Sequence, residues 1–313
     1  MSLRLTASTL AAAFALAGCG GGGATSPAAP ASPAASSPPT VTPQGHGSIP
    51  MSFSFPRKTT SSSARRPRYL SIETASLAIY DGTTLVYVAN VALDSTPQFT
   101  TVYAATGNTT VAPGSCSFTT SNATCGLTIT STIGAHAFDV ITYPESQDPG
   151  KPAGAPPTFT GVILSEGELS VSLSPGTNAA QSLHLNGVAD QVSISGPANA
   201  PFNEPQTFGY QIEDSGNAQI VGTGTYDNGP VTITASPSGI VSIAPSSFTA
   251  PPSSAGDQNF SVTCINGGGG SVTISFNVQT SPDTTYASGL TYATGNYPGA
   301  IIGTAPFQCF GPS

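Results

Sequence analysis

The residues best suited to covalent chemistry in this chain are its five cysteines, because the 313 residues include only three histidines and no tryptophan. One of them, Cys19, stands directly after an uncharged and mainly apolar run that extends from about residue 10 to residue 18. The other four are Cys116, Cys125, Cys264 and Cys309. No two of these have the C-x-x-C spacing that is typical of zinc ligands. The pattern separates a solitary thiol near the start of the chain from four thiols that are able to pair.

The solitary thiol ends the sequence Leu16-Ala17-Gly18-Cys19, which resembles the lipobox of a bacterial lipoprotein signal peptide. The apolar run before it is far shorter than the roughly 20 residues that a membrane-spanning helix needs. The resemblance implies that residues 1–18 are removed as a signal peptide and that lipid such as palmitate is attached to the Cys19 sulfur. Lipoproteins of this kind carry two or three acyl chains, and stable anchoring takes at least two. The expected location is the outside of the cell envelope, in the outer membrane if the organism has one, since glycine rather than aspartate follows the cysteine.

Residues 19–67 are rich in glycine, alanine, proline and serine and offer little apolar surface to bury, so we predict a disordered tether with a basic end. His46 falls within this range and is expected to be solvated rather than a metal ligand. The basic end belongs to a cluster of five residues, Arg57, Lys58, Arg65, Arg66 and Arg68, the last of which begins the first predicted sandwich. Such a cluster suits either contact with anionic lipid headgroups or cell-wall polymers, or a solvated linker edge where the first strand begins.

The remainder of the chain is strongly acidic. All fifteen Asp and Glu residues lie after residue 68, where Lys151 is the single basic residue, so one positive charge stands against fifteen negative charges and the formal charge of residues 69–313 is −14. A body of this charge repels nucleic acid, and no nucleic-acid partner is expected.

The four later cysteines predict two disulfides, because an even number of cysteines in a chain that leaves the cytoplasm is typical of disulfide bonding. Four cysteines allow three pairings. We expect Cys116 to pair with Cys125, since the short segment between them contains Thr-Thr-Ser-Asn and is typical of a hairpin turn, and Cys264 to pair with Cys309. In the chain-entropy model the shorter loop contributes roughly 3 kcal/mol and the longer one roughly 4 kcal/mol.

Apolar and polar residues alternate with a period of two in seven places, and this alternation predicts strands with one buried face. The runs are Leu127 and Ile129, Phe138 and Val140, Val171 and Leu173, Leu183 and Leu185, Val192 and Ile194, Val231 and Ile233, and Val272 to Val278. Turn signals such as Asp81-Gly82, Asn186-Gly187 and Ser238-Gly239 lie between them. The expected fold is all-β, with two tandem antiparallel immunoglobulin-like β-sandwiches after the tether. They occupy residues 68–187 and 188–313, and the second carries a C-terminal extension.

Residues 208–222 read Phe-Gly-Tyr-Gln-Ile-Glu-Asp-Ser-Gly-Asn-Ala-Gln-Ile-Val-Gly. This run resembles the strand, turn and strand of the bacterial immunoglobulin-like domains found in invasin-like surface proteins. Asp214 suits such a turn because it can accept turn amides, and Gly216 and Asn217 tolerate left-handed dihedrals. The resemblance covers about residues 190–280 and implies an immunoglobulin-like sandwich there. Residues 134–143 instead resemble a strand of transthyretin-like sandwiches.

We expect no catalytic activity, since the sequence contains no G-x-S-x-G, H-E-x-x-H, Walker or dinucleotide-binding motif. A glycosidase needs two carboxylates that face one cleft. The acids close in sequence are Glu166 with Glu168 and Glu213 with Asp214, and both pairs are more typical of a surface strand or turn. The remaining histidines, His136 and His184, lie in alternating strands, and His184 is expected on the solvent face.

Two binding alternatives use other residues. Calcium could be held by Glu213, Asp214, Asn217, Asp227 and Asn228, whose oxygen atoms suit a hard cation. Turns that are satisfied by their own backbone are the more common outcome for such a sequence. Sugars could stack on Tyr286, Tyr292 and Tyr297, although packing against the second sheet explains the spacing of these tyrosines more simply.

Together these features favour a lipid-anchored cell-envelope protein that acts as a non-catalytic adhesion, scaffold or binding module, without a cofactor or a metal. The expected partners are the membrane, reached through the N-terminal lipid, and an envelope polymer or protein. The alternative is a carbohydrate-active or otherwise hydrolytic envelope enzyme that uses Asp and Glu.

Overall fold

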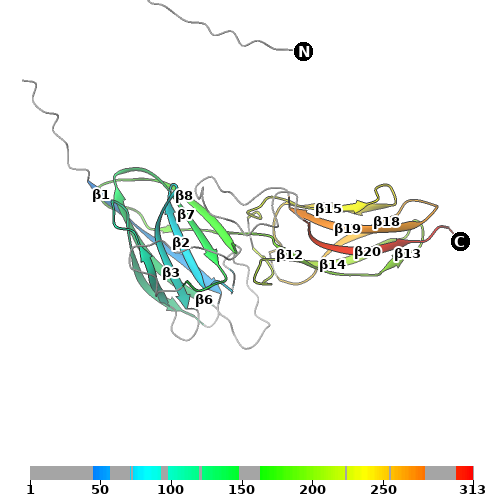
Figure 1. The fold of residues 1–313 in the computed structure, drawn as a ribbon, viewed down its shortest axis with the longest axis horizontal. Coiled ribbons are helices and arrows are strands. Elements are labelled where there is room, and N and C mark those ends of the chain that lie inside the picture. Colours follow the sequence, from blue (N-terminus) through cyan, green and yellow to red (C-terminus); the bar gives the residue numbers. More distant parts are fainter. Residues whose placement is uncertain are drawn as a thin grey trace, which may run out of the picture. The chain divides into compact units, whose positions relative to one another are not determined.

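The computed structural model describes residues 45–56, 71, 73–92, 98–119, 122–147, 163–222, 224–253, 255–278 and 301–312. These residues form twenty strands and no helix, and none of them belongs to a helix that could cross a membrane. The strands make four sheets whose apolar faces pack in pairs as sandwiches (Figure 1). The all-β class predicted from the alternating pattern is confirmed.

The first sheet of the first sandwich has the strand order β10-β1-β6-β5, and β9 also pairs with β1. Its strands are β1 (His46–Pro56), β5 (Thr110–Phe118), β6 (Asn122–Thr132), β9 (Gly176–Thr177) and β10 (Gln181–Ser182). Strand β1 runs antiparallel to β6 over its whole length, from His46 opposite Thr132 to Pro56 opposite Asn122. With β9 and β10 on its other side, β1 is an interior strand of this sheet.

The second sheet of the first sandwich has the order β11-β8-β7-β2-β3-β4. Its strands are β2 (Ser76–Asp81), β3 (Thr84–Ala92), β4 (Gln98–Ala104), β7 (Gly134–Tyr143), β8 (Ser165–Leu173) and β11 (Asn186–Gly187). The predicted Asp81-Gly82 turn joins β2 to β3, and Gly82 has a φ of 58°. This left-handed conformation favours glycine because glycine has no Cβ.

Alternate residues of the two sheets meet in one apolar core. Strand β1 contributes Ile49, Met51, Phe53 and Phe55 to this core, each at most 2% exposed. The rings of Phe53 and Phe55 meet Phe99 of β4 edge-on, with centroids 6.4 and 6.0 Å away. Full burial of a large apolar side chain contributes about 1.5–3 kcal/mol, so the alternating face of β1 is a main source of stability for this sandwich.

The second sandwich is built in the same way from two sheets with the orders β12-β14-β18-β16 and β13-β20-β19-β15-β17. The strands of the first of these sheets are β12 (Gln191–Ser195), β14 (Pro205–Glu213), β16 (Val241–Ala244) and β18 (Gln258–Cys264). Those of the other are β13 (Asn199–Ala200), β15 (Val231–Ser236), β17 (Ser247–Phe248), β19 (Gly270–Val278) and β20 (Ile301–Cys309).

Aromatic rings from both of these sheets form the centre of the second core. Phe208 stacks on Phe260 with centroids 5.1 Å apart and meets Phe307 of the opposite sheet edge-on at 5.5 Å. Phe276, which is fully buried, meets Phe260 edge-on at 5.5 Å. The core therefore joins the two sheets through direct ring contacts, which stabilise beyond the area they bury.

The tether predicted over residues 19–67 is wrong for residues 46–56, because these residues form β1. The glycine, serine and proline content of the segment concealed a two-residue alternation of buried side chains. Pro50 cannot donate a ladder hydrogen bond, and β9 and β10 pair with β1 only at residues 47–48 and 51–52, on either side of it. The first sandwich consequently begins before residue 68, and the exposed His46 is a strand residue.

The C-terminal extension predicted for the second unit is also corrected, because residues 301–309 form the interior strand β20. Strand β20 pairs with β19 from Cys309 opposite Gly270 to Ile301 opposite Asn277. The register shifts between Phe276 and Asn277, and Pro306 interrupts the sequence pattern of β20. On its other side β20 pairs with β13 only at residues 308–309, so Pro306 lies where no second ladder is needed.

Candidate functional site

Two disulfides are present, with the pairing expected from the sequence. Cys116 lies directly opposite Cys125 on the neighbouring strands β5 and β6. Cys264 of β18 and Cys309 of β20 belong to different sheets, and each is at most 1% exposed. The second bond therefore ties the two sheets of a sandwich together inside its core, whereas the first closes a hairpin within one sheet.

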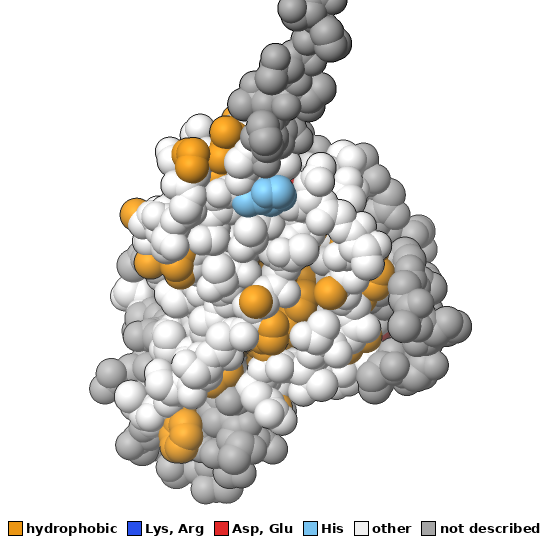
Figure 2. Space-filling model, turned by 90° about the vertical axis from the view of Figure 1, so that its left-hand side faces the viewer, with side chains coloured by type: hydrophobic (Ala, Val, Ile, Leu, Met, Phe, Trp, Pro, Cys, Tyr) orange, Lys and Arg blue, Asp and Glu red, His pale blue; other side chains and the backbone are white. Residues whose placement is uncertain are grey.

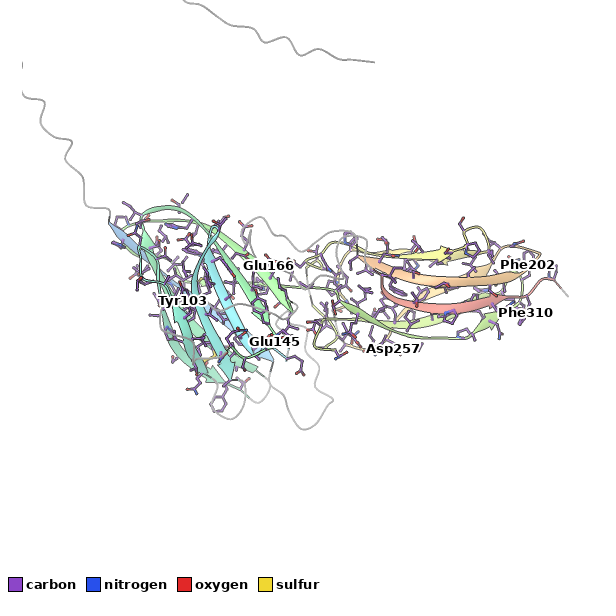
Figure 3. The ribbon with its side chains drawn as sticks, in the orientation of Figure 1. Tyr103, Glu145, Glu166, Phe202, Asp257 and Phe310 are labelled. Carbon is purple, nitrogen blue, oxygen red and sulfur yellow. A yellow bond between two sulfur atoms is a disulfide. The ribbon has the colours of Figure 1, made fainter. Side chains whose placement is uncertain are left out.

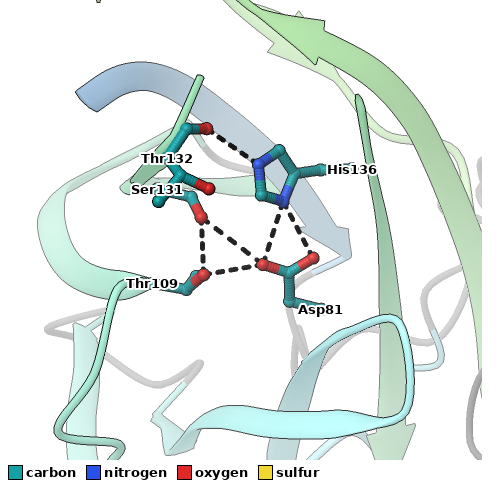
Figure 4. Close-up of polar contacts among 5 residues, drawn as sticks. All are labelled: Asp81, Thr109, Ser131, Thr132 and His136. Atoms are coloured by element: carbon teal, nitrogen blue, oxygen red, sulfur yellow. Dashed lines mark hydrogen bonds and ion pairs between the residues drawn. The ribbon is translucent and has the colours of Figure 1, made fainter. Parts of the chain in front are cut away.

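Asp81, Thr109, Ser131 and His136 form a polar cluster that combines residue types used in hydrolysis (Figure 4). Nδ1 of His136 lies 3.0 Å from both carboxylate oxygens of Asp81, and Nε2 lies 2.8 Å from the carbonyl oxygen of Thr132. The Thr109 hydroxyl donates to Oδ2 of Asp81 at 2.6 Å. The Ser131 hydroxyl oxygen is 2.6 Å from that of Thr109. All the polar atoms of the cluster are thus engaged with one another or with the backbone.

This cluster holds strands together and contains no activated nucleophile. In a nucleophilic triad the hydroxyl bonds to the imidazole nitrogen that is remote from the acid. Here that nitrogen of His136 faces a backbone carbonyl, and Ser131 bonds to Thr109 instead. The His136 ring also stacks on Phe138, with centroids 5.4 Å apart and planes at 1°. Because the cluster joins β2 and β7 of one sheet to β6 of the other, its hydrogen bonds hold the two sheets together.

His184, the other histidine expected in a strand, is exposed.

A second group of polar residues lies on β2, β7 and β8. Asp139 of β7 is fully buried and Glu166 of β8 is 3% exposed, while Tyr80 of β2 lies opposite Asp139 in the ladder. Burial first, and then the charges of Asp139 and Glu166, raise the pKa of Tyr80. Glu166 and Glu168 differ in burial. Glu166 is buried, whereas Glu168 is exposed and accepts a hydrogen bond from Ser170 at 2.6 Å.

Sequence reasoning missed Asp139, although a single acid inside the apolar run 138–143 is a signal for it. Asp139 and Glu166 lie on adjacent strands of one sheet, rather than on facing loops of a cleft as a glycosidase pair would. Their neighbours on this face form a small apolar cluster of Ala78, Tyr80, Val88, Ile141, Tyr143, Ile163 and Val188. The acids are therefore part of a packed sheet face.

The turn after β14 is held by its own aspartate, as the sequence predicted. Asp214 is 3% exposed and accepts hydrogen bonds from the backbone amides of Gly216 at 2.9 Å and Ala218 at 3.0 Å. Burial raises the pKa of Asp214 and the nearby Glu73 charge raises it further, whereas hydrogen bonds from the Ser71 side chain and the turn amides act in the opposite direction. The carboxylate therefore stabilises the turn by accepting hydrogen bonds from its amides, although burial removes the carboxylate from water.

The calcium ligands considered above are Glu213, Asp214, Asn217, Asp227 and Asn228. Asp214 is occupied by its turn, and Glu213 accepts a hydrogen bond from Ser193 at 3.0 Å. The Asn228 amide is bonded to both backbone groups of Ala189. Within the part of the chain that the structure describes, no group of three or more His, Cys, Asp or Glu residues is placed to hold a metal ion.

The described residues include acids but no lysine or arginine. All seven Lys and Arg residues lie outside the described ranges, whereas twelve of the fifteen acids lie within them. Figure 2 shows one face on which hydrophobic side chains and a histidine patch stand among uncharged side chains. Cys19, the basic cluster of residues 57–68 and the three tyrosines between residues 286 and 297 also lie outside the described residues.

One end of the second sandwich carries exposed apolar side chains next to the buried disulfide. Ile265 and Phe310 directly follow Cys264 and Cys309, and each is 50% exposed. Phe202 lies at the same end (Figure 3). Exposed apolar groups that gather at one place are candidates for contact with a partner.

No protein-family model matches the sequence, and the search of curated proteins found no match.

Proposed function

We propose that this protein is a lipid-anchored cell-envelope protein that acts as a non-catalytic adhesion, scaffold or binding module. The sequence Leu16-Ala17-Gly18-Cys19 carries the proposal, since cleavage before the cysteine and acylation of its sulfur anchor the chain outside the cytoplasm. The two disulfides support this location, because such bonds persist in oxidising compartments.

The polar residues named above make hydrogen bonds that hold strands and turns, and this supports a binding role over a catalytic one. Asp81 and His136 join strands, and Asp214 holds a turn. The end of the second sandwich marked by Ile265 and Phe310 offers apolar surface for contact. Partner recognition at this end would bury side chains that are half exposed in the protein alone.

Acylation of Cys19 is expected to place the protein in the membrane fraction. Bacteria that express the full chain are fed an alkyne-tagged palmitate, and the recovered protein is examined for label and for intact mass with and without reduction. The mature chain should begin at Cys19, carry the label, and gain four hydrogen atoms on reduction of its two disulfides. The Cys19→Ser variant should carry no label.

Gly22→Ser is the matched control, because it changes one residue three positions further along without altering the thiol. It should be labelled like the wild type. An unlabelled wild-type protein that retains residues 1–18 would overturn the proposed anchoring.

A further inference from the structure

The segment 185–190, which connects the two sandwiches, is buried. Leu185, Val188 and Ala189 are at most 1% exposed, and Asp190 is 8% exposed. Connections between domains are ordinarily exposed, with few contacts across them. The Asn186-Gly187 dipeptide, which predicts a turn, instead forms strand β11 and pairs with residues 165–166 of β8.

Backbone hydrogen bonds join this segment to both sandwiches. On the side of the first sandwich, the Val188 amide donates to the Leu164 carbonyl oxygen at 3.0 Å. On the side of the second, the Asp227 amide donates to the Gly187 carbonyl oxygen at 3.0 Å, and the Asp190 amide donates to the carbonyl oxygen of β14 residue Glu213 at 3.0 Å. The segment therefore has partners on both sides within four residues.

Asn228 holds the centre of the segment. Its side chain is fully buried, its Oδ1 accepts a hydrogen bond from the Ala189 amide at 3.0 Å, and its Nδ2 donates to the Ala189 carbonyl oxygen at 2.7 Å. One side chain thus satisfies both backbone groups of Ala189. Loss of either bond would leave a buried polar group without its partner, which costs more than an exposed hydrogen bond is worth.

Two adjacent residues of the connection pack into different apolar clusters. Val188 belongs to the small cluster on the first sandwich that includes Tyr80, and Ala189 belongs to the core of the second sandwich. A rotation about the bonds between these two residues would withdraw at least one of them from its cluster. The connection consequently cannot swivel without losing buried contacts.

Two glycines allow close approach beside the connection. A Cβ on Gly187 would lie 2.6 Å from Cγ2 of Ile220, and a Cβ on Gly216 would lie 2.7 Å from Cβ of Glu73. Real Cβ atoms essentially never show such distances. A larger residue at either position would therefore require Ile220 or Glu73 to shift.

We propose that residues 185–190 and Asn228 form a rigid coupling that makes the two sandwiches move as one body. The coupling depends on the backbone hydrogen bonds of Gly187, Val188 and Asp190, on the two bonds from the Asn228 side chain to Ala189, and on the packing of residue 188. It does not depend on the proposed anchoring, because it concerns only contacts within residues 44–313, which form one compact unit.

Backbone ¹⁵N relaxation of the full chain with Cys19→Ser tests the coupling. Correlation times for rotation are fitted separately to amides of strands β1–β8 and of strands β12–β20. The two values should be equal in the protein with the native junction. In the Asn228→Ala variant both should fall, and they should differ from each other.

Asn277→Ala is the matched control, because Asn277 of β19 also donates side-chain hydrogen bonds, to Thr234 Oγ1 at 3.0 Å and to the Ser275 carbonyl oxygen at 3.2 Å. It is the same change in the same sandwich, away from the connection, and should leave the two correlation times equal.

Unequal correlation times with the native junction, or equal and unchanged values in Asn228→Ala, would overturn the coupling. If Asn228→Ala fails to fold, Gly187→Ala tests the coupling instead, because this variant removes no hydrogen bond and acts through contact with Ile220. A well-dispersed amide spectrum with separated correlation times supports the proposal, and unchanged correlation times contradict it.

Discussion

Removal of the Cys264–Cys309 disulfide should destabilise its sandwich more than removal of Cys116–Cys125 destabilises the other. The bonded residues are separated by 45 positions in the first case and by 9 in the second. In the chain-entropy model these loops correspond to about 4 kcal/mol and about 3 kcal/mol of unfolding free energy. The difference reflects how much freedom each bond removes from the unfolded chain.

Burial should widen this difference. Cys264 and Cys309 are both at most 1% exposed, whereas in the hairpin pair Cys125 is fully buried and Cys116 is only half-buried. Replacement of a buried sulfur pair by alanine leaves space that the surroundings fill only in part, which adds a cavity cost. Cys264→Ala with Cys309→Ala should therefore cost at least about 4 kcal/mol, and the hairpin pair about 3 kcal/mol with a smaller cavity cost, because only one of its cysteines is fully buried.

Guanidinium unfolding followed by far-UV circular dichroism measures both losses, because the chain has no tryptophan to report by fluorescence. Hydrogen exchange with mass spectrometry assigns each transition, using peptides from β18 to β20 for the second sandwich and from β5 and β6 for the first. Equal losses, or a larger loss for the hairpin pair, would refute the reasoning from loop length and burial.

Two further predictions concern polar residues. His136→Leu removes a donor to Asp81 and should lower the unfolding free energy by about 1–3 kcal/mol, measured by denaturant titration. His184→Leu, at an exposed position, should change the unfolding free energy by no more than about 0.5 kcal/mol in the same titration. Equal losses in the two variants would contradict the structural role of the polar cluster. Because the pKa of Asp214 is raised in the folded state, the folded protein binds this proton more tightly than the unfolded chain. Stability from this residue is therefore greatest at low pH and falls as pH rises above the ordinary value of 3.8. Urea unfolding at a series of pH values should show a shallower fall for Asp214→Asn, and an identical pH dependence would count against the raised pKa.

Much of the strand pattern could be predicted because its signal is local. On β6 and β15 the buried residues alternate along a few consecutive positions, and this period places them on one face whatever else the chain does. Strand β7 differs from its predicted alternation, because residues 138–143 are all buried. The turns at Gly82 and Gly239 are equally local, and both glycines have positive φ angles, of 58° and 82°. The Cys116–Cys125 pair follows from two positions close in sequence.

The interior strands β1 and β20 were not predicted. Strand β1 carries a local alternation of apolar residues at positions 49, 51, 53 and 55, but the glycine, serine and proline around it favoured a tether. Strand β20 has no regular alternation of buried residues, and it contains Pro306, so its place depends on the partner that supplies its ladder. For β1 that partner is β6, which lies more than 60 residues further along the chain, and for β20 it is β19. The burial of Asp139 likewise depends on which strands lie beside β7.

The amino-acid sequence by itself determined the all-β class, many of the strands and turns, and the Cys116–Cys125 pair, because these follow from side-chain period, backbone preference and proximity along the chain. Only the tertiary structure decided that residues 46–56 belong to a sheet, that the Asn186-Gly187 turn signal becomes a buried strand, and that Asn228 holds Ala189. Each of these depends on hydrogen bonds and packing between residues distant in sequence, whose free energy exists only once the sheets have assembled.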